Sequence, residues 1–135
     1  MTAMTTETRQ LIMRNDFPAV PAAVGVARRV AERKLEVWRV PPRVVEGIGL
    51  VISELATNAV KETNVPSFTL TLAEDVPGAI TVEVWDSSPN EPRRKEPGLH
   101  DEGGRGLVIV EALACHYGVR PDPKGKTVFA VIETQ

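Results

Sequence analysis

The hydrophobic pattern predicts two consecutive helices in the first half of the chain. In residues 46–64 the apolar positions recur at roughly 100° per residue, the helical period. Residues 22–38 have the same period, and Pro21 suits the first turn because its missing N–H needs no partner there. Pro41 and Pro42 separate the two segments. The apolar stripe of the second helix contains Val44, Ile48, Val51, Leu55 and Ala59.

Alternating apolar and polar positions predict strands in the second half. Residues 67–72 alternate, and in the next segment, 79–86, the residues Ile80, Val82 and Val84 share one face. Asp86 continues that face, so its carboxylate points toward the core side and needs a polar partner. Three further strands are predicted. One is an edge strand at 10–14, followed by a turn at 15–18, and the other two form a hairpin-like pair at 119–121 and 126–132.

Between the strands lies a segment without hydrophobic period, Ser87–Gly103. At about 17 residues it exceeds the usual loop length in a compact domain, and such loops are often lids over a binding site or disordered segments. Gly103–Gly106 then opens a run with helical spacing that we expect to end at Gly118.

The composition fits one compact domain over residues 9–135, preceded by a flexible terminus at 1–8. A net charge of −2 argues against general binding to nucleic acid or to an anionic membrane. Neither a membrane-spanning run nor a signal-peptide pattern is present, so we expect a cytoplasmic protein. With two histidines, and with Cys115 as the only cysteine and expected in the core, a zinc site has few candidate ligands.

Two polar side chains on the second helix are the first candidates for chemistry. Glu54 and Asn58 are four residues apart, so they lie on the same side of the helix at the edge of its apolar stripe. One interpretation is a pair satisfied by neighbouring backbone or by solvent. The other is a site where Asn58 gives an oxygen to a hard cation and Glu54 handles a proton.

The glycines before the last predicted helix are the second candidate. A glycine-rich turn at a helix N-terminus places backbone N–H groups and a favourable dipole against phosphate oxygens, although glycines also begin helices for steric reasons alone. Two other nucleotide motifs fail here. Gly125-Lys126-Thr127 lacks the earlier glycine and the following helix of a P-loop, and Gly104-Arg105-Gly106 lacks the last glycine of a dinucleotide-binding motif.

The order of these features resembles the Bergerat ATP-binding fold of histidine kinases and of Hsp90-like and gyrase-like ATPases. Within that superfamily the chain is most similar to the anti-sigma-factor serine kinases of actinobacterial type. The segment SELATNAV (53–60) is similar to the family's N-box, and GGRGLVIVEALACHYGV (103–119) to its second glycine box with the following helix. Residues 17–35 look like the family's first helix.

The resemblance implies a role for each candidate residue. Asn58 would bind Mg²⁺ between the phosphates of ATP, and Glu54 would be the general base. Asp86 would accept a hydrogen bond from the adenine amino group, supported by Thr127. Phosphate would lie against Gly104, Gly106 and the Leu107 amide. Lys61 and Arg105 would neutralise phosphate charge, unless they are ordinary surface charges.

The implied fold is an α/β (α+β) two-layer sandwich with a mixed, mainly antiparallel sheet and helices on one face. The implied function is that of an ATP-dependent serine/threonine kinase that holds a sigma factor and phosphorylates an antagonist protein, with a homodimer expected from the resemblance. The superfamily's first glycine box, D-x-G-x-G, has Ser88 and Asn90 in place of its glycines. The alternative is therefore a module of the same fold that sequesters a partner with weak or absent catalysis.

Overall fold

The computed structural model describes residues 11–62, 64–88 and 102–135. The predictions for residues 1–8 and for most of the lid, residues 89–101, lie outside these ranges. Five strands form one sheet in the order β1-β2-β3-β5-β4. Their bounds are β1 Leu11–Pro18, β2 Ser67–Val76, β3 Ala79–Asp86, β4 His116–Asp122 and β5 Gly125–Glu133.

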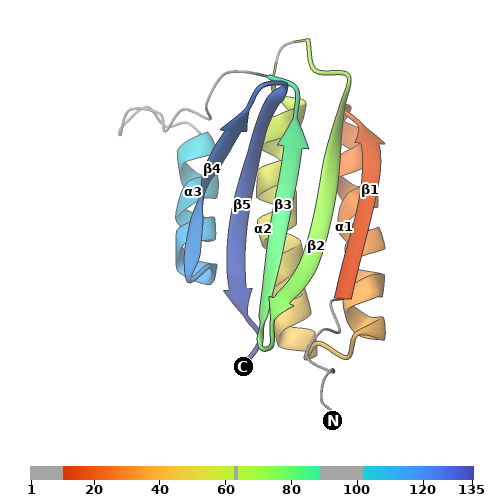
Figure 1. Ribbon diagram of the computed structural model, residues 1–135, viewed down its shortest axis with the longest axis vertical. Helices are drawn as coiled ribbons and strands as arrows, with labels where there is room; N and C mark the ends of the chain where they lie inside the picture. The colour runs from red at the N-terminus through yellow and green to blue at the C-terminus, as the bar shows by residue number, and fades with distance from the viewer. Residues whose placement is uncertain (1–10, 63, 89–101) are drawn as a thin grey trace.

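The helices all cover the same face of this sheet. They are α1 Pro21–Val37, α2 Pro42–Val60 and α3 Glu102–Leu113. In Figure 1 the three helices lie behind the sheet, with α1 behind β1, α2 behind the centre and α3 behind β4. Helix α2 contacts α1, α3 and the strands β2, β3 and β5, so it is the central element of the helical layer. None of the described helices is long and apolar enough to cross a membrane.

The core lies between the two layers and follows the predicted periods. Strand β3 and the first six residues of β2 bury every second residue, and the fully buried side chains of α2 recur at helical spacing. The largest fully buried residues include Phe68, Leu70, Leu72, Ile80, Ile48, Ile52 and Leu55. The expected two-layer α+β sandwich is confirmed, and every strand pair of the described sheet is antiparallel.

The first strand is longer than predicted. Residues 15–18, predicted as a turn, continue β1 and pair with β2 as far as Pro18 opposite Ser67. The Phe17 ring is buried and stacks on Phe68 with centroids 5.5 Å apart. This cross-strand packing outweighs the turn preference of the local sequence, and the proline is tolerated because β1 is an edge strand.

The last helix is shorter than predicted. It ends at Leu113, and Gly118, the predicted end, lies inside β4. The change occurs at Cys115, whose N–H donates to the Val131 carbonyl of β5 at 2.9 Å. Pairing with β5 therefore replaces the helical hydrogen bonds that the apolar pattern favours. The Cys115 side chain, expected in the core, is exposed.

Candidate functional site

A buried polar cluster lies where β3 and β5 end beside the C-terminus of α2. Asp86 is the last residue of β3 and is 2% exposed. Its carboxylate accepts hydrogen bonds from Lys126 Nζ, at 2.9 Å to Oδ1 and 3.2 Å to Oδ2. The backbone N–H of Ser88 donates to the same Oδ1 at 2.8 Å. The prediction that Asp86 points inward and has a polar partner is therefore confirmed.

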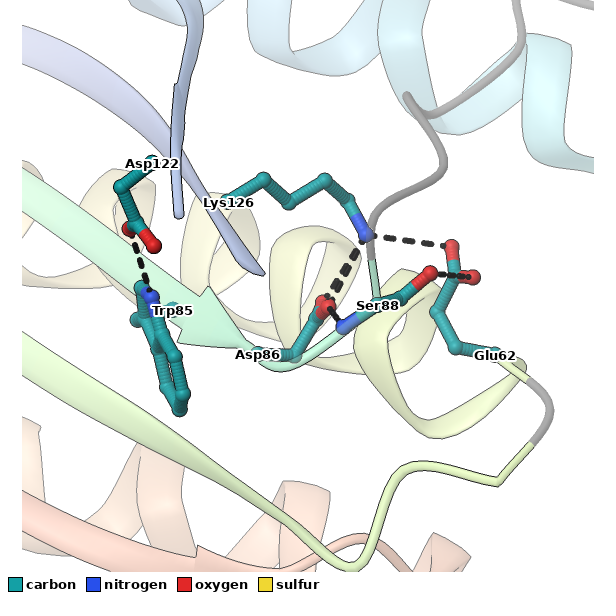
Figure 2. A network of polar contacts seen from close by, with 6 residues as sticks. All are labelled: Glu62, Trp85, Asp86, Ser88, Asp122 and Lys126. Carbon is teal, nitrogen blue, oxygen red and sulfur yellow. Dashed lines mark hydrogen bonds and ion pairs between the residues drawn. The ribbon is translucent and has the colours of Figure 1, made fainter. Parts of the chain in front are cut away.

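Glu62 completes the cluster from the turn that follows α2. Its Oε2 lies 3.4 Å from Lys126 Nζ, and its Oε1 accepts a hydrogen bond of 2.9 Å from Ser88 Oγ. Figure 2 shows the Lys126 ammonium group between the carboxylates of Asp86 and Glu62. The cluster thus joins three parts of the chain and holds two carboxylates around one ammonium group.

The close approach of two backbones fixes the position of Asp86. A Cβ added to Gly125, the first residue of β5, would lie 2.0 Å from the Asp86 carbonyl oxygen and 2.8 Å from Ser87 Cα. Both neighbours are backbone atoms, so no side-chain rotation can relieve the overlap. Only glycine allows β5 to begin this close to the end of β3.

Glu54 and Asn58 lie on the C-terminal half of α2 and are both half-buried. Within the described part of the chain, neither side chain makes a hydrogen bond or an ion pair. Glu62 follows four residues after Asn58, so these three residues lie along one side of α2 and its final turn. The carboxylate and the carboxamide therefore have free polar atoms on the side of the helix that leads to the Asp86 cluster.

The residues predicted to contact phosphate lie at the C-terminal end of α2 and in the first turns of α3. Lys61 is the exposed C-cap residue of α2. Because α3 begins at Glu102, Gly104 lies in its first turn, where backbone N–H groups have no partner within the helix. Gly106 and Leu107 lie in the second turn, where N–H groups normally bond within the helix. The side chain of Arg105 lies outside the described part of the structure.

Thr127 is separated from Asp86 by the sheet. It is paired with Trp85, whereas Lys126 is paired with Asp86. Successive residues of a strand point to opposite faces, so Thr127 shares the outer face with Trp85. The structure therefore does not bring Thr127 to the Asp86 carboxylate, and Lys126 takes that place.

The outer face has polar contacts of its own near Thr127. The Trp85 Nε1–H donates to Asp122 Oδ2 at 2.9 Å, and the Arg120 guanidinium lies 4.9 Å above the Phe129 ring. The backbone N–H of Lys124 and then the Trp85 indole hold the pKa of Asp122 below its ordinary value, because both donate to the charged form. These contacts stabilise the β4–β5 hairpin and lie on the face away from Glu54 and Asn58.

Sequence reasoning missed Lys126 and Glu62. The signal for Lys126 was available, because it has the same strand parity as Val128, Ala130 and Ile132, which are buried. Counting back by twos from those residues puts Lys126 on the core face. Nothing local marks Glu62, since its partners come from β5 and from the residues after β3.

Asn58 is available as a ligand for a magnesium ion, whereas Asp86 is less available as a hydrogen-bond acceptor for a nucleobase. Among the described residues, no group of three or more His, Cys, Asp or Glu side chains could hold a metal ion by itself. Mg²⁺ usually takes few protein ligands and completes its shell with water and phosphate oxygens, a role that the unengaged Asn58 amide suits. The Asp86 carboxylate, by contrast, is already engaged by Lys126.

The layer of helices on one face of an antiparallel sheet, with this polar cluster at the sheet end, is a two-layer α+β architecture (Figure 1). Residues 17–132 match the family described as histidine kinase-like ATPase domain, and the chain belongs to that family. The resemblance found in the N-box and the second glycine box is therefore confirmed. No curated protein matches the chain.

Solved structures with low sequence identity share the fold. The RsbU and RsbW domains of Rv1364c from Mycobacterium tuberculosis match with a TM-score of 0.70 and 19% identity, covering 90% of this chain and 31% of that one. This chain thus spans about a third of the mycobacterial chain. The SiaB-SiaC complex from Pseudomonas aeruginosa matches with a TM-score of 0.68 and 13% identity over 94% of this chain and 93% of that one. A histidine kinase domain from Erythrobacter litoralis matches at 0.53 and 20% identity, covering 87% and 62%.

Proposed function

We propose that the protein is an ATP-binding regulator that acts as a serine/threonine kinase of the anti-sigma-factor type. Membership of the histidine kinase-like ATPase family supports the binding of ATP. The observation that carries the catalytic part is the pair Glu54 and Asn58. These side chains are half-buried on the central helix and have no partner in the described part of the chain, while the Asp86 cluster beside them is fully paired.

The proposed roles follow from the chemistry of each side chain. The Asn58 amide oxygen is a ligand for Mg²⁺, which neutralises phosphate charge when bound. The Glu54 carboxylate takes the proton from an attacking serine or threonine hydroxyl as the new oxygen–phosphorus bond forms and ADP leaves. Phosphate contacts come from Lys61, Arg105 and the Gly104 backbone N–H in the first turn of α3, with Gly106 and Leu107 in the turn that follows. Asp86 is the acceptor for the adenine amino group.

The proposed partners are a sigma factor or similar regulator and an antagonist protein that receives the phosphate. Two similar structures support this direction, since one contains an RsbW domain and the other is a complex between two proteins, SiaB and SiaC. Regulation of transcription in the cytoplasm and a homodimer belong to the same proposal.

Calorimetric titration with ATP, with and without Mg²⁺, tests the binding site. We expect Asn58→Ala to weaken Mg²⁺-dependent ATP binding by at least about tenfold, because it removes a ligand to a charged group, a contact of about 1.5–3 kcal/mol. The matched control is Asn15→Ala on the exposed surface of β1, which should bind ATP like the unmodified protein. Unchanged affinity in Asn58→Ala, or no ATP binding by the well-folded protein, would contradict the proposal.

ADP formation in a single turnover, with water as the acceptor, tests the chemical step. Glu54→Ala should keep its ATP affinity and lose about 10²–10⁴-fold in rate, the usual contribution of a general base. Glu46→Ala on the exposed side of the same helix is the control. ATP binding without any ADP formation by the unmodified protein would favour the alternative, a partner-sequestering module.

A further inference from the structure

We propose that Lys126 sets the affinity and the base selectivity of the nucleotide site. Its ammonium group competes with the amino group of the base for the carboxylate of Asp86. This inference rests on the proposed function, in which Asp86 is the acceptor for the adenine amino group. It adds a residue and a mechanism that the roles of Glu54 and Asn58 do not include.

The Asp86 carboxylate already accepts several hydrogen bonds within the protein. Oδ1 accepts from the Ser88 N–H at 2.8 Å and from Lys126 Nζ at 2.9 Å, and Oδ2 accepts from Lys126 Nζ at 3.2 Å. Both carboxylate oxygens are therefore engaged within the protein. These bonds use three of the roughly four acceptor positions of a carboxylate, two of them through Lys126, so a base amino group competes with Lys126 for Asp86.

Charge and burial make the ion pair between Lys126 and Asp86 a strong competitor for the amino group of the base. The side chains of Lys126 and Asp86 are 3% and 2% exposed, so solvent screens their attraction little. An ammonium group binds a carboxylate more strongly than a neutral amino group does, because its hydrogen bond is charge-assisted. Lys126 therefore lowers the affinity for any base whose recognition depends on Asp86.

Glu62 provides the position to which the ammonium group withdraws. Its Oε2 lies 3.4 Å from Lys126 Nζ, and Ser88 Oγ holds its other oxygen at 2.9 Å. A shift from Asp86 toward Glu62 keeps a carboxylate beside the ammonium group throughout (Figure 2). The C-terminal end of α2 also favours a positive charge there. Glu62 thus makes the exchange feasible and helps to set its cost.

Two nucleotides separate this competition from a general structural effect. ATP carries an amino group at position 6 of the base, while inosine triphosphate carries a carbonyl oxygen there, which accepts hydrogen bonds and cannot donate to Asp86. We expect Lys126→Met to bind ATP about tenfold more tightly than the unmodified protein, because the acceptor becomes free. The affinity for inosine triphosphate should stay within about twofold, so the ratio of the two affinities rises.

Lys124→Met is the matched control for this variant. Lys124 is exposed in the turn two residues before Lys126, so its substitution removes the same charge and leaves the Asp86 cluster intact. It should leave both affinities unchanged. An equal gain for ATP in Lys124→Met would attribute the effect to net charge and overturn the proposal.

Glu62→Gln gives a prediction of opposite sign. The amide still accepts from Ser88 Oγ but no longer attracts the ammonium group, so Lys126 stays on Asp86 and ATP binds about threefold to tenfold more weakly. Calorimetry at neutral pH measures all variants, and circular dichroism confirms their folding. If Lys126→Met does not fold, Lys126→Gln replaces it. Its neutral amide binds Asp86 less strongly than the ammonium group does, so ATP should again bind more tightly than to the unmodified protein.

The outcomes separate this inference from the proposed function. ATP binding by the unmodified protein with equal or weaker binding by the folded Lys126 variant overturns the role of Lys126 and leaves the ATP site standing. Binding by the variant and none by the unmodified protein supports the inference in its strongest form. Absence of binding in both overturns both. An unchanged or tighter ATP affinity in Glu62→Gln overturns the proposed withdrawal of Lys126 to Glu62.

Discussion

At the scale of single residues, Gly125 decides where the end of β3 lies. We predict that Gly125→Ala lowers the free energy of unfolding by about 1–3 kcal/mol, because the new Cβ would overlap backbone atoms of Asp86 and Ser87 that have no alternative rotamer. Urea denaturation followed by circular dichroism measures the change. ATP affinity should fall in parallel if Asp86 is displaced.

Gly25→Ala is the control for this substitution. Gly25 lies inside α1, and the nearest atom to an added Cβ is the flexible Arg29 Nη1 at 3.5 Å. Replacing a helical glycine by alanine usually adds about 0.5–1 kcal/mol of stability. Equal destabilisation by both substitutions would show that close backbone packing at Gly125 has no special role.

At the scale of elements, α2 holds the core on its buried face and the candidate catalytic pair at the edge of that face. We predict that Leu55→Ala lowers the free energy of unfolding by about 2–5 kcal/mol, since Leu55 is 2% exposed and its truncation leaves a cavity. Leu50→Ala in the same helix removes the same atoms from a side chain that is 38% exposed and should change stability by less than about 1 kcal/mol. Urea denaturation of the two variants compares them, and equal losses would contradict the assignment of the buried face.

The elements also show where sequence reasoning succeeds and fails. Helices α1 and α2 and strands β2 and β3 follow from their periods, because each is long and has one buried face. Helix α3 and strand β1 were misjudged at their ends. In both cases a hydrogen-bonded strand pair, β4 with β5 or β1 with β2, outweighs a local preference for helix or turn.

At the scale of the whole molecule, the sheet order predicts a gradient of local stability. β3 lies at the centre and is paired on both sides, whereas β1 and β4 are the edge strands. We predict that the amide protons of β3 exchange most slowly with solvent and that those of β4 exchange by local opening. Hydrogen exchange followed by NMR tests this order. Equal protection of β3 and β4 would indicate that the domain opens only as one unit.

The candidate site shows the limit of prediction at this scale. Glu54 and Asn58 could be found from sequence because both lie on one helix, four residues apart, and the period fixes their relation. Asp86 could be found because strand alternation places it inward. The pairing of Lys126 with Asp86 and Glu62 joins residues up to 64 positions apart (126 − 62), and no local pattern fixes such a contact.

The sequence alone determined the periodic elements, the family and the candidate residues that share one element. These depend on spacing along a helix or strand, which the chain carries locally. Only the tertiary structure decided that the Lys126 ammonium group lies between the carboxylates of Asp86 and Glu62. It also decided where α3 ends. The register between β3 and β5 brings Lys126 to Asp86, and the pairing of β4 with β5 ends α3. Both are contacts between segments that no local pattern joins.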